Sequence, residues 1–400
     1  MLKIAILTYS TKPRGGVVHS LCLAENLARR GHEVRIIALD KKEGSGFFRT
    51  PGVPFNIIPF GSLPGNDFDA KIANYIQTYT DYFVAGKAKG FDIYHAQDCI
   101  SANALANWRQ SGADFPLVRT VHHLDDFTSP VLVNCQNKSI LNPDYHIAVS
   151  EYWQKRLATE YGVNARVIHN GLDTKRFTPA KKGSNPKKKF VPPNKLVFLT
   201  IGGIEPRKNT KKLLAAFVHV RKYFAESGKQ AVLVIGGGQT LFDYREYRQE
   251  FFQMVEDYDL EMGEDVINLG VLEEEEVPLL YQAADCFVFP SVQEGWGLVA
   301  LEALVSGIPT VVSNIPVFHE FLTHGKDALF IEPDNAQQFA AAMIGTIVNR
   351  EQRSRLISEG LLTASNFSWE DTARQHEQFY LEIMKERKAN LSCTKKAGRV

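Results

Sequence analysis

Short apolar runs alternate with longer amphipathic stretches along the whole chain. In the first half, runs typical of buried strands are followed by stretches in which apolar residues recur every three or four positions, as on one face of a helix. The predicted strands are 3–8, 34–39, 55–60, 92–95, 117–121, 145–149 and 166–168. The predicted helices are 17–28, 67–88, 101–110 and 151–161. Repeated strand–helix–strand units predict a mostly parallel sheet that is covered on both faces.

The alternation breaks once, in a stretch rich in lysine and proline at residues 178–194. A basic cluster can mark a nucleic-acid patch, but this charge is confined to one short run, so we interpret it as a solvated linker. Beyond it the alternation restarts. The predicted strands are 196–201, 231–235, 266–269, 286–289, 310–312 and 329–331. The predicted helices are 210–225, 244–258, 274–284, 298–305, 336–349 and 369–387, with a loose tail from Lys388.

The length of the chain predicts more than one domain. Because 400 residues exceed what one hydrophobic core usually organises, we expect two α/β domains of similar size. The predicted boundaries are a first domain at 1–178, a linker at 179–194, a second domain at 195–365 and a final helix at 366–388. Two such domains joined by a hinge would place a cleft at the carboxyl ends of both sheets, where ligands bind in α/β folds.

Composition narrows the functional classes. The chain carries 46 basic and 45 acidic residues, a formal net charge of +1, so nothing global favours a nucleic-acid partner. Five cysteines without CxxC spacing predict reduced thiols and a cytoplasmic protein, and argue against a disulfide framework or a zinc site. The first apolar run is too short for a signal peptide, and no apolar run approaches the ~20 residues of a membrane span. The sequence is compatible with peripheral contact with a membrane surface.

The stretch 289–303 carries the clearest chemical signal. A buried strand runs into a turn and then into a helix, and N–H groups at such a helix start bind phosphate well. The residues of this predicted anion site are Gly295, Trp296, Gly297, Leu298 and Val299. Glu294 and Glu302 would repel a phosphate, but they suit the hydroxyl groups of a ribose or a sugar. The stretch therefore points to a nucleotide sugar, although a plain turn with a surface glutamate has the same spacing.

The spacing Glu294-(seven residues)-Glu302 resembles the EX7E signature of retaining GT-B glycosyltransferases. Further segments resemble glycosyltransferase family 4 in the same order along the chain. These are Gly15-Gly16 before a helix, residues 29–34, residues 169–173 and Arg207-Lys208-Asn209. The resemblance covers nearly the whole chain. It implies a GT-B fold, with two Rossmann-like domains whose parallel sheets face across a cleft, an acceptor half, a nucleotide-sugar half and a last helix that crosses back.

The resemblance also assigns roles in the donor half. Glu302 matches the acid that binds ribose hydroxyls, Glu294 matches the one that faces the donor sugar, and Leu272 matches a position where backbone groups meet the base. Lys208 follows a strand and a glycine pair, and it would supply positive charge to the leaving diphosphate. The family pattern expects an arginine at Gly203, which this sequence lacks, so we expect Arg207 to take its place.

In the acceptor half, His122 ends a predicted strand and matches the active-site histidine of the family. It would donate a hydrogen bond to a sugar hydroxyl or act on the acceptor. Gly15 and Gly16 would let their loop approach the phosphate or the sugar without a Cβ clash, and a plain tight turn is the alternative. Asp98 lies on a cleft-side loop, where contact with the acceptor and capping of a helix are both open.

The sequence therefore predicts a hexosyltransferase that retains configuration and uses a UDP- or GDP-type sugar. The transferred group would be a hexose or an N-acetylhexosamine, and the acceptor is unknown: a saccharide, a lipid or a small metabolite. No DxD motif or His/Cys cluster stands where a metal would be needed, so we expect no metal and no other cofactor. Two alternatives stay open, a sugar-nucleotide epimerase of GT-B architecture and a non-catalytic nucleotide-sugar sensor.

Overall fold

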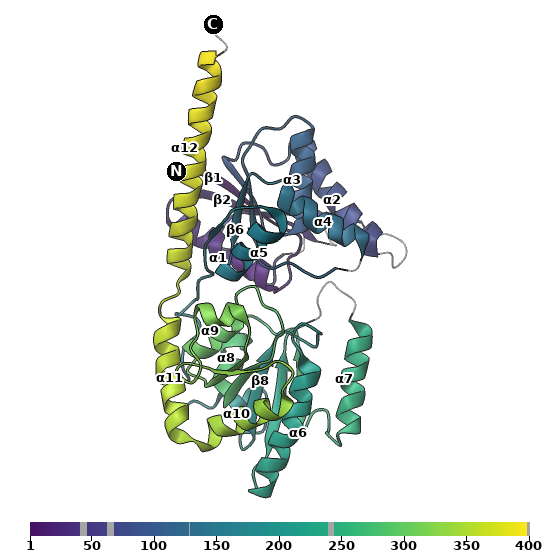
Figure 1. Cartoon of the computed structure of the whole chain (residues 1–400), viewed down its shortest axis with the longest axis vertical. Coiled ribbons are helices and arrows are strands. Elements are labelled where there is room, and N and C mark those ends of the chain that lie inside the picture. Colours follow the sequence, from purple (N-terminus) through teal and green to yellow (C-terminus); the bar gives the residue numbers. More distant parts are fainter. Residues whose placement is uncertain (41–45, 62–67, 128, 239–243, 398–400) are drawn as a thin grey trace. The chain divides into compact units, whose positions relative to one another are not determined.

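The computed structural model describes residues 1–40, 46–61, 68–127, 129–238 and 244–397. Within these ranges the chain divides into two compact units. The first unit comprises Met1–Gly171 and Trp369–Val400, and the second comprises Leu172–Ser368. Figure 1 shows both units coloured along the sequence.

The first unit is built on a seven-stranded parallel sheet of order β3-β2-β1-β4-β5-β6-β7. Its strands are β1 (Lys3–Thr8), β2 (Glu33–Asp40), β3 (Phe55–Pro59), β4 (Ile93–Ala96), β5 (Leu117–Val121), β6 (Tyr145–Ala148) and β7 (Ala165–Val167). Residues Ile4 to Leu7 of β1 are fully buried, because helices cover both faces of the sheet. The predicted strands are confirmed to within one or two residues.

The helices of this unit begin and end close to the predicted positions, with one addition. They are α1 (Gly15–Arg29), α2 (Phe68–Val84), α3 (Cys99–Gln110), α4 (Pro130–Leu141) and α5 (Glu151–Tyr161). Asp67, the predicted first residue of α2, lies outside the described residues. The sequence analysis missed α4, although Ser129 caps it and Pro130 occupies its first turn.

The last helix, α12 (Trp369–Ala397), packs on the first unit. Its residues Ala373, Tyr380 and Ile383 belong to the same buried cluster as Ile4 and Leu21. The predicted loose tail from Lys388 is wrong, because the helix continues to Ala397 through a run of residues without glycine or proline.

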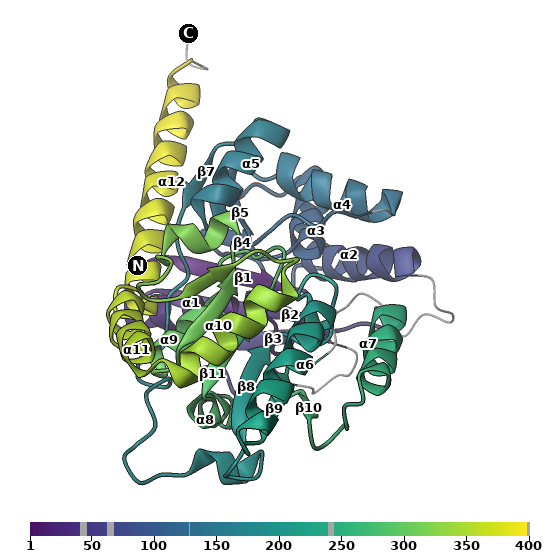
Figure 2. The same ribbon diagram turned by 60° about the horizontal axis from the view of Figure 1, so that its bottom comes forward.

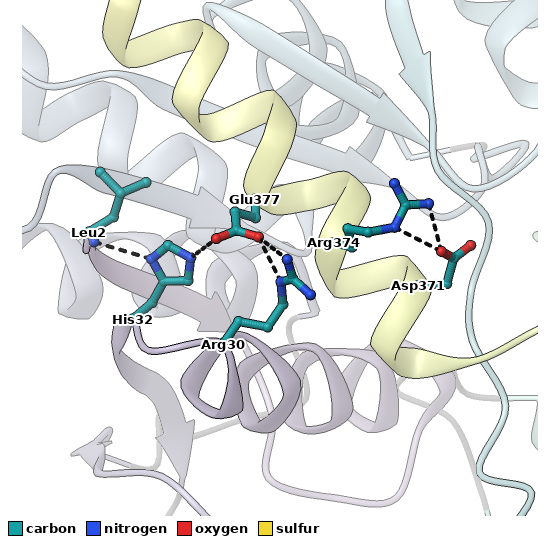
Figure 3. Close-up of polar contacts among 6 residues, drawn as sticks. All are labelled: Leu2, Arg30, His32, Asp371, Arg374 and Glu377. Atoms are coloured by element: carbon teal, nitrogen blue, oxygen red, sulfur yellow. Dashed lines mark hydrogen bonds and ion pairs between the residues drawn. The ribbon is translucent and has the colours of Figure 1, made fainter.

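A polar network fastens α12 to the rest of the unit (Figure 3). The carboxylate of Glu377 accepts a hydrogen bond from Nε of Arg30 at 2.6 Å and lies 3.0 Å from Nε2 of His32. The backbone N–H of Leu2 donates to Nδ1 of His32 at 3.1 Å, so the ring carries its hydrogen on Nε2 and donates it to Glu377. Glu377 therefore ties the helix to the end of α1 and the start of β2.

The second unit contains a six-stranded parallel sheet of order β10-β9-β8-β11-β12-β13. Its strands are β8 (Leu196–Ile201), β9 (Ala231–Gly236), β10 (Val266–Gly270), β11 (Cys286–Phe289), β12 (Thr310–Ser313) and β13 (Leu329–Ile331). Its helices are α6 (Thr210–Glu226), α7 (Arg245–Asp257), α8 (Glu276–Ala283), α9 (Leu298–Val305), α10 (Ala336–Val348) and α11 (Arg350–Ala364). Helices α6 and α10 pack side by side over the sheet (Figure 2). Only α11 was not predicted.

The lysine-rich stretch 179–194 belongs to this second unit and includes a short 3-10 helix, Pro186–Lys189. Lys187 pairs with Asp285 at 2.5 Å and Lys189 pairs with Glu276 at 3.0 Å, both residues of the second unit. Part of the positive charge is therefore tied to the protein's own carboxylates. The predicted domain boundaries stay a prediction.

Candidate active site

The site predicted in the second unit forms at the carboxyl edge of two neighbouring strands. β8 leads through residues 202–209 into α6, and β11 leads through residues 290–297 into α9. The two strands pair directly, and the chain order of the sheet reverses at this point. Such switch points are where open α/β sheets bind ligands.

Three charged side chains meet there. Nζ of Lys208 lies 2.7 Å from Oε1 of Glu294, and a guanidinium nitrogen of Arg207 lies 3.0 Å from the same oxygen. Arg207 also donates to the carbonyl of Gln293 at 3.0 Å. Lys208 and Glu294 are buried, whereas the side chain of Arg207 is a quarter exposed. Arg207 thus points into the site, and the structure brings together three of the four predicted catalytic residues.

Burial and charge act against each other in this group. Burial, together with the neighbouring Arg207, lowers the pKa of Lys208 to about 8, although Glu294 opposes the shift. Burial alone would raise the pKa of Glu294, but Lys208 and Arg207 beside it hold that pKa at about 2. All three groups are therefore charged at neutral pH. Their sum is one positive charge in a site largely closed to water.

The turn that follows Glu294 leads directly into α9. Gly297 has φ +96°, and a Cβ there would lie 2.6 Å from Cε1 of Phe318, so only glycine fits. Among the described residues, the backbone N–H groups of Gly297, Leu298 and Val299 have no hydrogen-bond partner. Trp296 contributes only its backbone to this turn, because its ring is buried against Phe321 and Phe367. Gly295 is also buried there.

The absence of an arginine at position 203 has a steric cause. Gly203 has φ +78°, and a Cβ at this position would lie 2.5 Å from the carbonyl oxygen of Gly238. The two glycine loops after β8 and β9 pack backbone against backbone, so no side chain can be accommodated. Positive charge on this side of the sheet must come from another position, as it does from Arg207 and Lys208.

Glu302 lies on α9, in a different environment from Glu294. The hydroxyl of Tyr281 donates to its Oε2 at 2.8 Å and also reaches the carbonyl of Val299 at 3.1 Å. Burial raises the pKa of Glu302 to about 7, although Tyr281 and Arg176 oppose the shift. Leu272, the residue predicted to meet the base, is half-buried beside Gly236 at the end of β9.

His122 is the predicted site residue of the first unit, and it follows β5 directly. Its Nε2 lies 3.0 Å from Oε1 of Gln97, and its ring meets that of His19 edge-on with centroids 4.9 Å apart. Burial and the charge of Arg119 keep the pKa of His122 well below its ordinary value, so the ring is neutral. Gly16 borders it, because a Cβ there would lie 3.6 Å from Nε2 of His122.

The structure refines two predictions for the acceptor half. Gly15 and Gly16 form the first turn of α1 instead of a preceding loop, so their unpaired N–H groups belong to a helix start. Asp98 is a helix cap: its carboxylate accepts from the N–H groups of Ser101 and Tyr9, each at 2.8 Å. Of the two roles left open for Asp98, the structure shows the capping role.

The sequence analysis missed the residues that hold the predicted ones in place. Gln97 contacts His122, and Tyr281 contacts Glu302, from elements 25 and 21 residues away along the chain. No spacing rule connects such pairs. Gln97 alone had a usable signal, since it follows a strand whose carboxyl end lies at the same sheet edge as that of β5.

The described part of the chain contains no set of three or more His, Cys, Asp or Glu side chains arranged to hold a metal ion. None of its helices combines the length and the apolarity needed to cross a bilayer.

Known proteins match the chain in both halves. The model of Glycosyltransferase Family 4 matches residues 13–176, and that of Glycosyl transferases group 1 matches residues 181–363. The O-antigen chain mannosyltransferase RfbU of Salmonella typhimurium is 31% identical over 245 residues, which cover 60% of this chain and 61% of that protein. The alpha-monoglucosyldiacylglycerol synthase of Streptococcus pneumoniae is 27% identical, over 96% of this chain and 86% of that protein.

Solved structures share the fold. Sucrose-phosphate synthase from Thermosynechococcus elongatus aligns with a TM-score of 0.79 at 21% identity, covering 96% of this chain and all of that one. HepE from Anabaena aligns with a TM-score of 0.77 at 20% identity, covering 95% and 99%. The predicted α/β fold with two Rossmann-like domains is confirmed. Since both halves match glycosyltransferase models and the fold is shared along the whole length, this chain belongs to the GT-B glycosyltransferases of family 4.

Proposed function

We propose that this glycosyltransferase moves a hexosyl or N-acetylhexosaminyl group from a UDP- or GDP-type sugar to an acceptor, with retention of configuration. The observation that carries the proposal is the contact of Arg207 and the buried Lys208 with the buried Glu294, just before the start of α9. In the reaction the bond between the anomeric carbon and the diphosphate oxygen breaks, and its electron pair stays on the diphosphate. The acceptor hydroxyl oxygen forms the new bond to the anomeric carbon, and its proton passes to an oxygen of the leaving diphosphate.

The charge of this group suits the leaving diphosphate. The three side chains carry one net positive charge, and the start of α9 adds the equivalent of about half a charge from its N–H groups. Negative charge on the diphosphate oxygens grows as the bond breaks, so fixed cations in a dry site stabilise the transition state more than the bound donor. The same cations would do the work of a metal ion, and we propose that none is required.

The other predicted residues are proposed to bind the rest of the donor or the acceptor. Glu302 would accept hydrogen bonds from the ribose, with Tyr281 holding its second oxygen in place. Leu272 would contact the base through its backbone. Gly15, Gly16 and His122 would serve the transferred sugar or the acceptor from the first unit. The proposal includes a cytoplasmic location, which the reduced cysteines of the sequence support.

Relatives support the donor class. HepE from Anabaena has been solved in complex with UDP and glucose, and also with UDP-glucose. RfbU is named a mannosyltransferase, and the pneumococcal relative is named a glucosyldiacylglycerol synthase. The latter name keeps a lipid among the acceptors to be tested, together with saccharides and small metabolites.

The test is a panel of UDP- and GDP-sugars, with nucleotide release followed over time. Transfer or slow hydrolysis of one donor supports the proposal, and the anomeric configuration of the product, read by NMR, tests retention. Formation of an epimer of the donor without release of nucleotide would instead assign an epimerase. Binding without any turnover, in the presence of a broad acceptor mixture, would contradict the proposed reaction.

A further inference from the structure

A chain of buried polar side chains runs from His122 to the last helix. Gln97 lies between His122 and His95, with its Oε1 3.0 Å from Nε2 of His122 and its Nε2 3.2 Å from Nε2 of His95. The other nitrogen of His95, Nδ1, lies 2.6 Å from the hydroxyl of Tyr380 on α12. Thr120 adds a contact of 2.7 Å to Nε2 of His95. All of these hydrogen-bonded residues belong to the first unit.

These linking residues are closed to solvent. His95, Thr120 and Tyr380 are fully buried, and Gln97 is 3% exposed. Water cannot exchange the hydrogen-bond roles of such groups, so each donor must meet an acceptor within the protein. Burial also lowers the pKa of His95 well below its ordinary value, and the ring is neutral with a single N–H hydrogen.

The carboxamide of Gln97 determines which groups donate and which accept along this series of hydrogen bonds. Its oxygen faces His122 and its nitrogen faces His95, so it accepts from the first ring and donates to the second. His95 then accepts on Nε2 and carries its hydrogen on Nδ1, from which it donates to the oxygen of Tyr380. In the opposite direction Tyr380 would donate to Nδ1 of His95, and the Nε2–H of His95 would donate to Thr120 at 2.7 Å, but that N–H would also lie against the amide nitrogen of Gln97, 3.2 Å away.

We propose that Gln97, His95 and Tyr380 are positioning residues that hold His122 with its hydrogen on Nε2. The inference rests on the proposed function in one respect only, namely that His122 takes part in the transfer. In this form the Nε2–H is committed to Gln97, and Nδ1 is the nitrogen with a free lone pair. Among the described residues, none forms a hydrogen bond with that Nδ1. His122 therefore accepts a hydrogen bond from a hydroxyl of the sugar or the acceptor, whereas the sequence analysis had expected it to donate one.

The consequence for Tyr380 is specific. Without its oxygen, the Nδ1–H of His95 would be buried without an acceptor, so the hydrogen moves to Nε2, where Thr120 lies 2.7 Å away. That N–H repels the amide nitrogen of Gln97 and turns the carboxamide over. His122 then faces an N–H donor and takes its own hydrogen on Nδ1. A substitution on α12 thus changes the tautomer of a ring 258 residues earlier, which Tyr380 does not bond directly.

The experiment reads the tautomer of His122 in the donor-free protein by long-range 1H–15N correlation of labelled histidine, with the His122→Asn protein for assignment. We expect the Nε2–H form in the wild type and the Nδ1–H form in Tyr380→Phe. The matched control is Tyr94→Phe, because Tyr94 is a buried tyrosine of the same unit whose hydroxyl donates to the carbonyl of Ala88 at 2.9 Å. It should leave His122 unchanged.

Should Tyr380→Phe fail to fold, Gln97 supplies the second test. Gln97→Glu keeps an acceptor for His122 and should retain the Nε2–H form, whereas Gln97→Leu should give a mixture of both forms. A wild-type His122 in the Nδ1–H form, an unchanged tautomer in Tyr380→Phe, or an equal change in Tyr94→Phe would each overturn the proposal.

A kinetic measurement distinguishes a positioning residue from a merely structural one, because only the former changes kcat without changing the donor KM. Tyr380→Phe should lower kcat about tenfold, the worth of one hydrogen bond in the transition state, with the donor KM unchanged. A changed tautomer with full kcat would refute the positioning role. If the proposed transfer reaction is wrong, the donor panel gives no nucleotide release with any sugar, while the tautomer measurement on donor-free protein still tests the hydrogen-bond chain.

Discussion

Lys208 offers the sharpest test of the proposed leaving-group site. Its Nζ lies 2.7 Å from the Glu294 carboxylate and 4.5 Å from the ring centre of Phe289, and its side chain is 11% exposed. Solvent cannot screen a charge held in this way. Loss of one preorganised donor in such a site costs roughly 2.7–4 kcal/mol, or about 100- to 1,000-fold in kcat. We therefore expect Lys208→Ala to lower kcat by that factor, with a much smaller change in donor binding.

Stability has to be separated from catalysis in this variant. Removing one partner of a buried ion pair costs about 3–5 kcal/mol when the other charge is left alone. Here Glu294 keeps Arg207 at 3.0 Å, so we expect a smaller loss. Lys208→Met retains the alkyl stem beside Phe289 and removes only the charge. It should lose the same factor in kcat as Lys208→Ala and unfold at a higher temperature.

The assay is nucleotide release at saturating donor, with donor binding measured by calorimetry and folding by thermal unfolding. The matched control is Lys211→Ala, in the first turn of α6, whose ammonium pairs with Glu250 at the surface. An exposed pair contributes about 0–1 kcal/mol, so this variant should behave like the wild type. If both Lys208 variants keep a near wild-type kcat while folded, the leaving-group site is misassigned.

Three further outcomes follow from the same contacts. The pH profile of kcat/KM should be bell-shaped, rising through about pH 7 as Glu302 ionises and falling above about pH 8 as Lys208 loses its proton, and Glu302→Gln should lose the acidic limb. Activity should survive EDTA, and complete loss with rescue by Mg²⁺ or Mn²⁺ would contradict the metal-free proposal. Glu377→Ala should destabilise the fold by about 1–3 kcal/mol in thermal unfolding, because Arg30 and the buried His32 lose their acceptor. Arg374→Ala is its control: this arginine pairs only along α12 with the half-exposed Asp371, and an effect equal to that of Glu377→Ala would refute the fastening role (Figure 3).

The strands and most helices could be predicted from the sequence. Strands buried in a parallel sheet appear as short apolar runs, and the helices that cover the sheet show apolar residues at helical spacing. β11 is a continuous apolar run, β1 contains one at residues 4–7, and the helices between the strands show clear periodicity. The two missed helices lack that signal. Only Leu356, Gly360 and Ala364 of α11 are buried, and two of these have almost no side chain. α4 buries Ser139 and Cys135 beside its two apolar residues, so its pattern reads as irregular.

The candidate site also has features that could be predicted from the sequence and features that could not. Arg207, Lys208 and Glu294 could be named from the sequence, because they lie in segments that resemble glycosyltransferase family 4 and that follow predicted strands. Their mutual pairing could not, since it depends on β8 and β11 being neighbours in the sheet. The sequence shows that Gly203 is not an arginine, but the reason lies in the carbonyl of Gly238 on another loop. Partners that meet only through the fold leave no local pattern.

Glu294 has a double role that follows from these distances. A carboxylate beside an anion site appears unfavourable, because it would repel the diphosphate. Yet without it, Arg207 and Lys208 would be two like charges on adjacent residues, and the pKa of Lys208 is already lowered to about 8 by burial and by Arg207. Glu294 opposes that shift and fixes both cations from one oxygen. The same carboxylate therefore keeps Lys208 charged and orders the cations before a donor binds, which is the preorganisation that makes such charges effective in a transition state.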